Sequence, residues 1–341
     1  MKAASRVVTG SVSVLALSLG VAGSACANDS SAELAAGGLV MTKNAAIEMR
    51  AENLYISAKV VRVRYRFAND SPRDVTVTVA FPMPDITAGG IDDVLAVPTD
   101  SPTNFLAFTT RVDGRPVEAQ LEQRAIKDGV DRTAFLRGLA IPLAPHLRST
   151  NQAINRLPKA SQDELIHLGL AAAYDYDAGK GMQRRLAAIW TLKTTFFWSQ
   201  TFPAGRELVV EHRYRPAVGL TTETSWGSTY WPKDPAYAER RLHYCVDDNF
   251  VASAERARPP GDVGPPFTEE RIEYILTTGA NWKSPIGDFR MVIDKGDPDS
   301  LVSFCGEGVR KTGPTTFEVH HTNFTPTRDV SVLILKRAPS P

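Results

Sequence analysis

The sequence has 341 residues, of which 43% are hydrophobic and 23% are charged, and its formal net charge is +1. This composition predicts a folded protein, and the length allows two hydrophobic cores. The balance of charges argues against a nucleic-acid-binding protein, because such proteins normally carry an excess of basic residues.

The N-terminal segment predicts a secretory signal peptide over residues 1–27. Lys2 and Arg6 provide a positive start, residues 12–22 are mostly apolar, and Ala25-Cys26-Ala27 has the small residues of a cleavage site. We expect cleavage before Asn28 and a mature protein in the periplasm or the medium.

The N-terminal segment has two alternative interpretations, a membrane anchor and a lipid anchor. A membrane anchor needs about 20 apolar residues, and the run over 12–22 is shorter. A lipid on Cys26 is the alternative, although Gly23-Ser24-Ala25 lacks the aliphatic residue that usually begins a lipidation motif. No later segment is long and apolar enough to cross a membrane, so we expect the mature chain to lack a transmembrane segment.

Two runs of period two follow, over residues 61–67 and 75–81, and each predicts a strand with one buried face. The turn residues 69–72 between them predict an antiparallel hairpin. In the first run Val, Tyr and Phe alternate with Arg62, Arg64 and Arg66. These arginines either stay in water or cover their face against a helical insertion. If the row lies open, it is a candidate anionic contact surface.

The next elements are a hairpin and a helical region. Asp113-Gly114 between short β-prone runs predicts a hairpin over residues 112–117. From about 121 to 187 Ala, Leu and Gln dominate and β-branched residues are few, which predicts a helical insertion. One helix is expected over 132–139. Another is expected to begin at Gln162, where residues 161–164 fit a capping box.

The period-two pattern resumes in residues 188–215, where Leu208, Val210, His212 and Tyr214 share one face. We expect these strands to complete the sheet begun by the hairpin over residues 61–81. His212 lies among apolar neighbours, where a hydrogen-bonded core imidazole is the more common arrangement than a ligand.

Residues 219–266 predict an irregular connection with a short helix near 236–241, and five more short strands follow over 271–278, 289–294, 301–305, 316–322 and 329–336. The fold class is therefore mainly β with a helical insertion (α+β). We expect two antiparallel β-sandwich-like domains, over residues 28–218 and 219–341.

Three aromatic residues form a candidate ligand-binding cluster. Trp226, Tyr230 and Trp231 lie together in a Pro-rich segment, where flat rings can stack on a sugar, a peptide or a partner. The alternative is that these large rings fill the seam between the two domains, since aromatic side chains are usually buried.

His243, Asp247 and Asp248 are a candidate metal site, because imidazole and carboxylate form a plausible donor set. Charged residues in a loop are more often simply solvated. Cys245 and Cys305 are the cysteines left after cleavage, and an even pair in an exported protein predicts a disulfide. A metal or redox pair is the alternative, but the C-x-x-C spacing is missing.

Seven short blocks, over residues 53–57, 63–69, 79–86, 202–205, 212–216, 281–287 and 303–305, are similar to a bacterial family. The chain resembles the domain of unknown function 4424, and the likeness covers nearly the whole mature chain. It implies an exported bacterial protein with no assigned activity, and it assigns no catalytic residue and no cofactor.

These observations predict an envelope protein that acts as a non-catalytic binding or scaffold module, with an envelope protein or glycan as its partner. No Gly-rich phosphate loop and no nucleophile motif occurs in the sequence, so we predict no cofactor. The alternative function is an envelope hydrolase that acts on glycan or peptide at the domain seam, because catalytic groups can come from distant residues.

Overall fold

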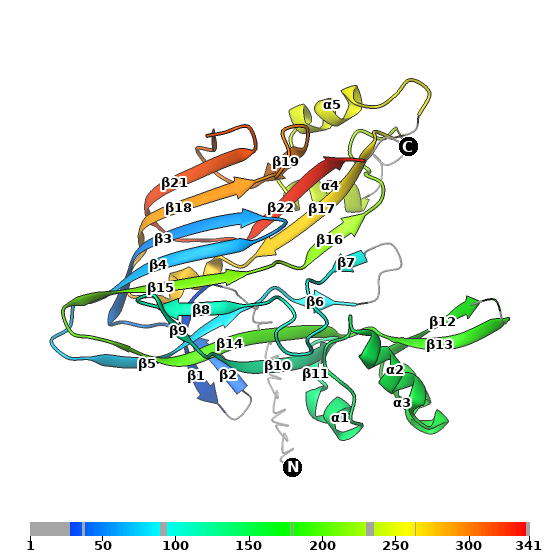
Figure 1. The fold of residues 1–341 in the computed structure, drawn as a ribbon, viewed down its shortest axis with the longest axis horizontal. Coiled ribbons are helices and arrows are strands. Elements are labelled where there is room, and N and C mark those ends of the chain that lie inside the picture. The colour runs from blue at the N-terminus through cyan, green and yellow to red at the C-terminus, as the bar shows by residue number, and fades with distance from the viewer. Residues whose placement is uncertain are drawn as a thin grey trace, which may run out of the picture.

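The structure is a computed structural model that describes residues 28–35, 38–88, 94–177, 179, 181–229, 235–262 and 264–338. The predicted signal peptide lies outside these residues. The described chain is mainly β, as predicted, and its strands form four sheets (Figure 1). Among the described residues, no helix has the length and hydropathy needed to cross a bilayer.

The eight-stranded sheet combines strands from both ends of the sequence. All its neighbouring strands are antiparallel except β18 and β3, which are parallel. Its order is β20 (Arg310–Lys311), β21 (Thr316–Phe324), β18 (Ile286–Asp294), β3 (Ile47–Ser57), β4 (Val61–Asn69), β15 (Arg206–Tyr214), β8 (Thr109–Val112) and β9 (Arg115–Val117).

The seven-stranded sheet packs against it. Its order is β11 (Val130–Asp131), β10 (Gln120–Lys127), β14 (Thr191–Phe202), β5 (Val75–Pro82), β1 (Ser30–Ala35) and β2 (Gly38–Thr42), with β6 (Ile86–Thr87) also beside β14. Rings from the two sheets meet in the core. The ring of Phe81 contacts those of His212 and Tyr214, and Phe67 contacts Phe202.

The predicted hairpin over residues 61–81 is wrong. β4 pairs with β3 and β15, whereas β5 pairs with β1 and β14, so the two strands belong to different sheets. The connection between them is an arch whose two strands send their apolar faces into the same core. The buried side chain of Asn69 holds this arch by donating hydrogen bonds to the carbonyls of Arg73 and Phe202, both at 2.8 Å. A hairpin and an arch each need one apolar face per strand, so the pattern alone does not separate them.

The strands predicted after residue 188 are present as β14 and β15, but they do not complete a single sheet, because β14 joins the seven-stranded sheet and β15 the eight-stranded one. β15 pairs with β4 and buries Leu208, Val210, His212 and Tyr214. The hairpin at Asp113-Gly114 is also present, as β8 and β9.

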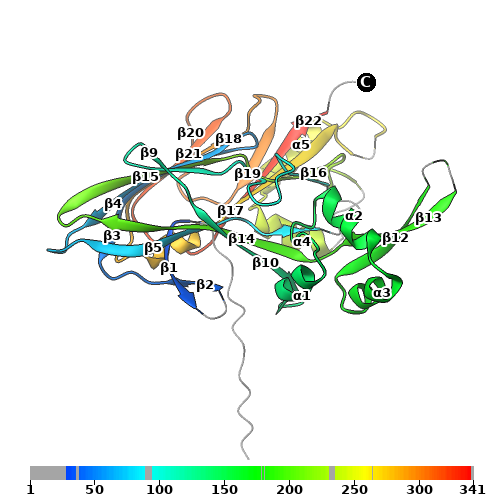
Figure 2. The same ribbon diagram turned by 60° about the horizontal axis from the view of Figure 1, so that its bottom comes forward.

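The helical region is smaller than predicted. Residues 120–127 are strand β10, and residues 171–188 form the projecting hairpin of β12 (Ala171–Asp177) and β13 (Met182–Ala188) (Figure 2). The expected helix near 132–139 is present as α1. The next prediction is wrong, because its helix begins at Lys159 and the side chain of Gln162 instead donates to the carbonyls of Asn155 and Leu157. The helices are α1 (Thr133–Gly138), α2 (Arg148–Arg156) and α3 (Lys159–His167).

The five-stranded sheet is buried on both sides. Val330 to Leu335 are all buried, because alternate residues of β22 face the main core and a second, smaller core. Two helices, α4 (Pro235–His243) and α5 (Asp248–Arg256), cover the smaller core (Figure 1). The sheet order is β19 (Leu301–Phe304), β22 (Val330–Arg337), β17 (Phe267–Tyr274), β16 (Val218–Thr221) and β7 (Val94–Ala96).

Strands cross the predicted domain boundary at residues 218 and 219. β18 pairs with β3, and β16, which spans the boundary itself, pairs with β7. The division into units that fold alone stays a prediction. The predicted disulfide between Cys245 and Cys305 is present, with Cα atoms 5.1 Å apart. It links the turn after α4 to the end of β19.

Candidate functional site

The row of arginines on β4 lies open on the outer side of the eight-stranded sheet. Arg62, Arg64 and Arg66 are exposed, and alternate residues Val63 and Tyr65 are buried. The helices α1, α2 and α3 lie at the far end of the seven-stranded sheet and do not cover this row (Figure 1). Of the two arrangements expected from the sequence, the open one is present.

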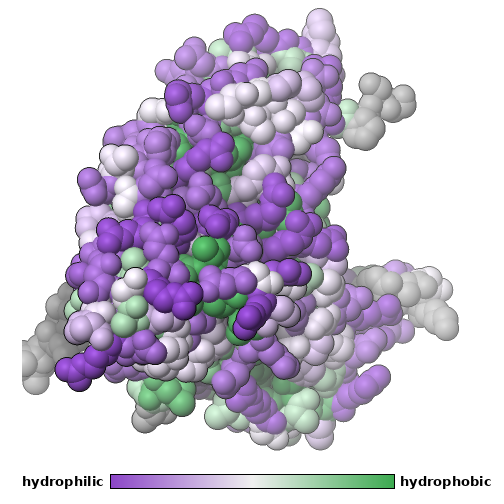
Figure 3. All heavy atoms as spheres, turned by 60° about the vertical axis from the view of Figure 1, so that its left-hand side comes forward, coloured by the Kyte–Doolittle hydropathy of each residue, from purple (hydrophilic) through white to green (hydrophobic). Residues whose placement is uncertain are grey.

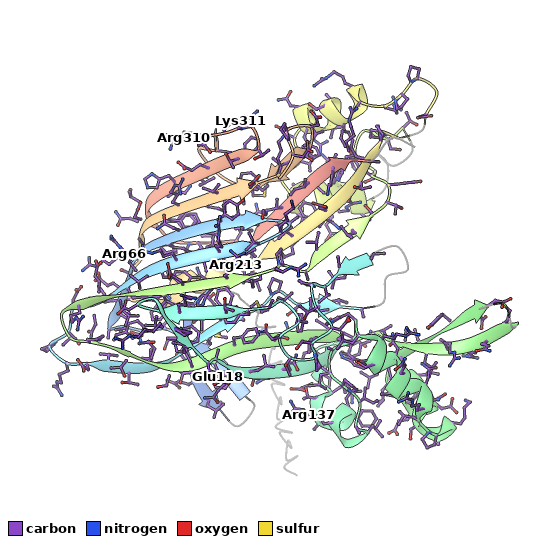
Figure 4. The ribbon with its side chains drawn as sticks, in the orientation of Figure 1. Arg66, Glu118, Arg137, Arg213, Arg310 and Lys311 are labelled. Carbon is purple, nitrogen blue, oxygen red and sulfur yellow. A yellow bond between two sulfur atoms is a disulfide. The ribbon has the colours of Figure 1, made fainter. Side chains whose placement is uncertain are left out.

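The register of β15 on β4 adds a second row. Arg213 lies opposite Arg62, Glu211 lies opposite Arg64, and Arg111 on β8 lies opposite Glu211. We call Arg62, Arg64, Arg66, Arg111 and Arg213 the arginine face. Figure 4 shows Arg66 and Arg213 on neighbouring strands, with Arg310 and Lys311 at the far edge of the same sheet.

Two of these arginines have carboxylate partners at the surface. Arg64 Nε lies 3.4 Å from Glu211 Oε1, and Arg66 Nε lies 3.9 Å from Glu207 Oε2. All four side chains are close to half exposed, so each pair contributes at most about 1 kcal/mol. These pairs are therefore weak enough to be exchanged for another anion.

Arg62 and Arg213 have no carboxylate partner among the described residues. The guanidinium of Arg62 lies over the ring of Tyr55, 4.4 Å from its centroid. Burial and a 2.7 Å hydrogen bond to Asp294 raise the pKa of Tyr55, so this ring stays neutral and is held in place. Like charges directly opposite on neighbouring strands destabilise a sheet. The pair of arginines therefore has a local electrostatic cost, and neither guanidinium has a carboxylate partner among the described residues to offset it.

A shallow groove of about 470 Å³ follows this part of the face. Four arginines and a single carboxylate line it, so its charge is strongly positive although the whole chain is nearly neutral. Its lining residues are Asn53, Arg62, Val63, Arg64, Thr109, Arg111, Glu211, His212 and Arg213. Planar guanidinium groups bind carboxylate, phosphate and sulfate oxygens with two parallel hydrogen bonds. The groove is thus suited to an anionic group.

With this geometry described, the chain can be compared with known proteins. The family model described as a domain of unknown function (DUF4424) matches residues 27–333. The chain belongs to this family. No curated protein matches it significantly. Among solved structures it is similar to a protein of Legionella pneumophila titled "putative nutrient binding protein", with 14% identity and a TM-score of 0.42 over 91% of this chain and 70% of that one.

Family membership assigns no site, and the predicted aromatic cluster is not an open surface at the residue that the structure describes. Trp226 is fully buried in the smaller core, where its ring contacts Tyr237 at 4.7 Å and the guanidinium of Arg240 at 5.2 Å. Tyr230 and Trp231 lie outside the described residues. Trp226 is therefore enclosed in the smaller core under α4 and α5, and not in a seam between the two predicted domains.

The three candidate metal ligands have separate partners. His243 Nε2 lies 3.2 Å from Glu273 Oε1, and this hydrogen bond raises the pKa of His243. Asp247 caps α5 by accepting from the backbone of Phe250, and Asp248 pairs with Arg241. Within the described part of the chain, no three His, Cys, Asp or Glu residues form a group that could hold an ion. The structure thus does not gather these residues into a metal site.

Sequence reasoning missed Arg111 and Arg213 as members of the face. The alternation in residues 208–215 already placed Arg213 on the polar side of its strand. What it did not contain was the register that brings Arg213 opposite Arg62, because a period of two reports a face and not a partner.

Proposed function

We propose that this chain is a non-catalytic binding protein of the bacterial cell envelope, and that its arginine face binds an anionic group of an envelope protein or glycan. The predicted signal peptide supports an exported protein. The disulfide between Cys245 and Cys305 supports the same compartment, because such bonds persist in oxidising surroundings.

The observation that carries the proposal is the pairing of Arg62 with Arg213. Two positive side chains face each other across neighbouring strands, on the exposed side of a sheet and without a carboxylate partner among the described residues. Proteins break local rules of this kind mainly at functional sites. A bound anion would remove the repulsion and gain charge-assisted hydrogen bonds.

The shape of the groove favours a polymer as the ligand. Its arginines are spread over β4, β15 and β8, and they lie along an exposed sheet surface. On the neighbouring side of the molecule, hydrophilic side chains cover most of the surface and apolar ones show only in small areas between them (Figure 3). A chain with repeated anionic groups could lie across several arginines at once, whereas a small molecule would be poorly enclosed.

The hydrolase alternative needs acid and base groups that a substrate can reach. The closest pairing of such groups in the interior is His212 with Asp29, and both side chains are completely buried. Aromatic rings of Tyr65, Phe81 and Phe108 surround the imidazole. This arrangement favours binding at the surface over chemistry at this pair.

Affinity measurements on the purified mature protein test the proposal. Titration with polyphosphate, dextran sulfate and poly-glutamate covers the three anion types, and uncharged dextran is the negative control. We expect at least one anionic polymer to bind, with an affinity that falls as salt is added. Replacing Arg62 and Arg213 by Ala should weaken that binding about tenfold or more.

The matched control is the double replacement of Arg310 and Lys311 by Ala. It removes the same charge from the same sheet, but at β20, on the opposite edge from β8 and β9. Its affinity should stay close to that of the unchanged protein. Equal losses in the two double variants, or no binding of any of the three polymers, would overturn the proposal.

A further inference from the structure

The first described residues lie inside the protein. Asn28, Asp29 and Ser30 are polar, consecutive and completely buried. The backbone N–H of Asn28 donates to Thr278 Oγ1 at 2.7 Å, and the Thr278 hydroxyl donates back to the carbonyl of Asn28 at 2.8 Å. Three polar residues at the start of a domain are normally exposed and poorly ordered, so their burial calls for a reason.

A specific set of contacts holds this segment. Trp282 Nε1 donates to the carbonyl of Asp29 at 2.7 Å, and Asn281 donates to Ser30 Oγ at 3.0 Å. Gly279 leaves the space for it, because a Cβ at that position would come within 2.7 Å of the Asn28 side-chain nitrogen. The short helix η1 (Thr277–Asn281) and the following residue, Trp282, therefore form a specific binding surface for residues 28–30.

A buried acid on β3, Glu52, also contacts the N-terminal segment. A bulge between Met49 and Ala51 shifts the register of the strand, so Ile47 and Met49 face the core before it and Glu52, Leu54 and Ile56 face the core after it. The Glu52 carboxylate is completely buried. It accepts from the Asn28 side-chain amide at 3.0 Å and from the Tyr274 hydroxyl at 3.5 Å.

Glu52 has no cationic partner in this cluster. Its carboxyl group accepts from two neutral groups, Asn28 and Tyr274, whereas Asp29 Oδ1 lies 2.9 Å from Nε2 of the buried His212. Asn28 Oδ1 and Asp29 Oδ2 are buried acceptors without a hydrogen-bond partner among the described residues. Burial raises the pKa of Glu52 to about 8, so its carboxyl group is kept protonated at pH 7. The cluster thus lacks a cation beside Glu52 and hydrogen-bond donors for two acceptors.

We infer that proteolysis before Asn28 completes this core, because it creates a buried α-ammonium group that serves as the counter-ion of Glu52. Water adds across the peptide bond after Ala27, which leaves a carboxylate on the released segment and an ammonium on Asn28. The new ammonium carries three N–H donors in place of one. One donor keeps the bond to Thr278, and the others are available for the unpartnered acceptors. Removal of the leader is then also a folding step.

Two measurements on the native protein test this without any variant. N-terminal sequencing of protein recovered from the envelope should show Asn28 as the first residue. Acetylation with an amine-reactive ester at pH 7 should modify the lysines but not the α-amine until the protein is unfolded. A first residue other than Asn28, or an α-amine that reacts in the folded protein, would overturn the inference.

A pair of chains with equal net charge tests the energetic role. One begins at Asn28, and the other carries Gly-Ser-Ala before Asn28, so that its ammonium lies three residues away. The chain that begins at Asn28 should melt about 3 °C or more above the extended one. Glu52→Gln should lower the melting temperature of the first chain and raise that of the extended chain at pH 7, because only the extended chain buries Glu52 without a counter-ion.

Glu48→Gln is the matched control for this reversal. Glu48 lies on the same strand, but its carboxylate is at the surface and pairs with Arg50 and Lys283. Its replacement should shift both chains by the same amount. A Glu52→Gln effect of equal sign in the two chains would show that the new ammonium does not pair with Glu52.

Discussion

Neighbouring residues of the same strands build two opposite kinds of charged site. On β15, His212 points inward to Asp29 and Arg213 points outward to Arg62. The inner site is closed, and the described chain itself supplies most of its partners. The outer site is open, and its central arginines, Arg62 and Arg213, lack carboxylate partners in the described chain. The difference indicates where each site acts: the inner one stabilises the fold, and the outer one is available to bind something else.

The same contrast exists between two His–Asp pairs whose histidines lie on strands of the eight-stranded sheet. His212 and Asp29 are completely buried, whereas His320 and Asp288 pair at 2.5 Å with about half of each side chain exposed. Burial strengthens an electrostatic interaction and also makes a missing partner costly.

Removing the buried imidazole should have the largest effect. His212→Ala leaves the Asp29 carboxyl group buried without its 2.9 Å hydrogen-bond partner, which should cost roughly 3 to 5 kcal/mol of unfolding free energy. His320→Ala removes an exposed pair and should cost less than about 1 kcal/mol. Urea unfolding of the two variants measures both values. Similar losses would mean that burial does not distinguish the pairs.

Much of the fold was predictable from local patterns. Alternation identified strands β4, β5 and β15 and their faces, including the inward His212, whereas the strands of the Ala-rich region, β10, β12 and β13, were predicted as helical because their composition favours helix. Alternation does not report which strands pair, so it does not distinguish the arch after Asn69 from the predicted hairpin. It also missed Glu52, because the bulge at Arg50 interrupts the period that would have placed it in the core.

The sequence blocks that resemble the family make contacts between distant parts of the chain. Asn69 and residues 202–205 lie in the two connections between the main sheets, after β4 and after β14, and Gly205 N donates to the carbonyl of Asn69 at 2.8 Å. The block over 281–287 seats the N-terminal segment through Asn281 and Trp282, and its Gly287 allows the bulge, since a Cβ there would lie 2.7 Å from the carbonyl oxygen of Arg50. Contacts of this kind join distant parts of the chain, so sequence spacing does not show them.

The unfolding free energy of the extended chain should depend on pH through Glu52 in the inner site. The expected change is similar in size to the loss caused by His212→Ala. Burial, with a smaller contribution from the charge of Asp29, raises the pKa of Glu52 from 4.5 to about 8. Below pH 4.5 both the folded and the unfolded chain hold this proton. Between pH 4.5 and 8 only the folded chain keeps it, so this contribution to stability should fall by roughly 5 kcal/mol.

The other titratable groups facing Glu52 are Asp29, His212, Tyr65 and Tyr274, and they are the same in every variant of this series. Glu52→Gln should therefore remove most of the decline without removing other pH effects. Chemical unfolding at pH 5, 6, 7 and 8 measures the slope. An unchanged slope in the variant would assign the decline to another group.

The smallest expected effect is at the arginine face, and its sign is informative. Arg213→Glu places a carboxylate opposite Arg62 and replaces a repulsion by an ion pair, so it should stabilise the protein by about 0.5 to 1 kcal/mol. Arg310→Glu makes the same charge change on β20, but it breaks the 2.9 Å pair with Glu318 and should destabilise the protein by a similar amount. Both shifts should shrink in 1 M salt, because the groups are exposed. Urea unfolding at low and high salt measures them.

The stability and binding results together decide why the two arginines face each other. If Arg213→Glu gains stability and loses affinity for the anionic polymer, then the repulsion between Arg62 and Arg213 is retained for binding. A loss of stability in both reversals would show instead that Arg213 already has a structural partner.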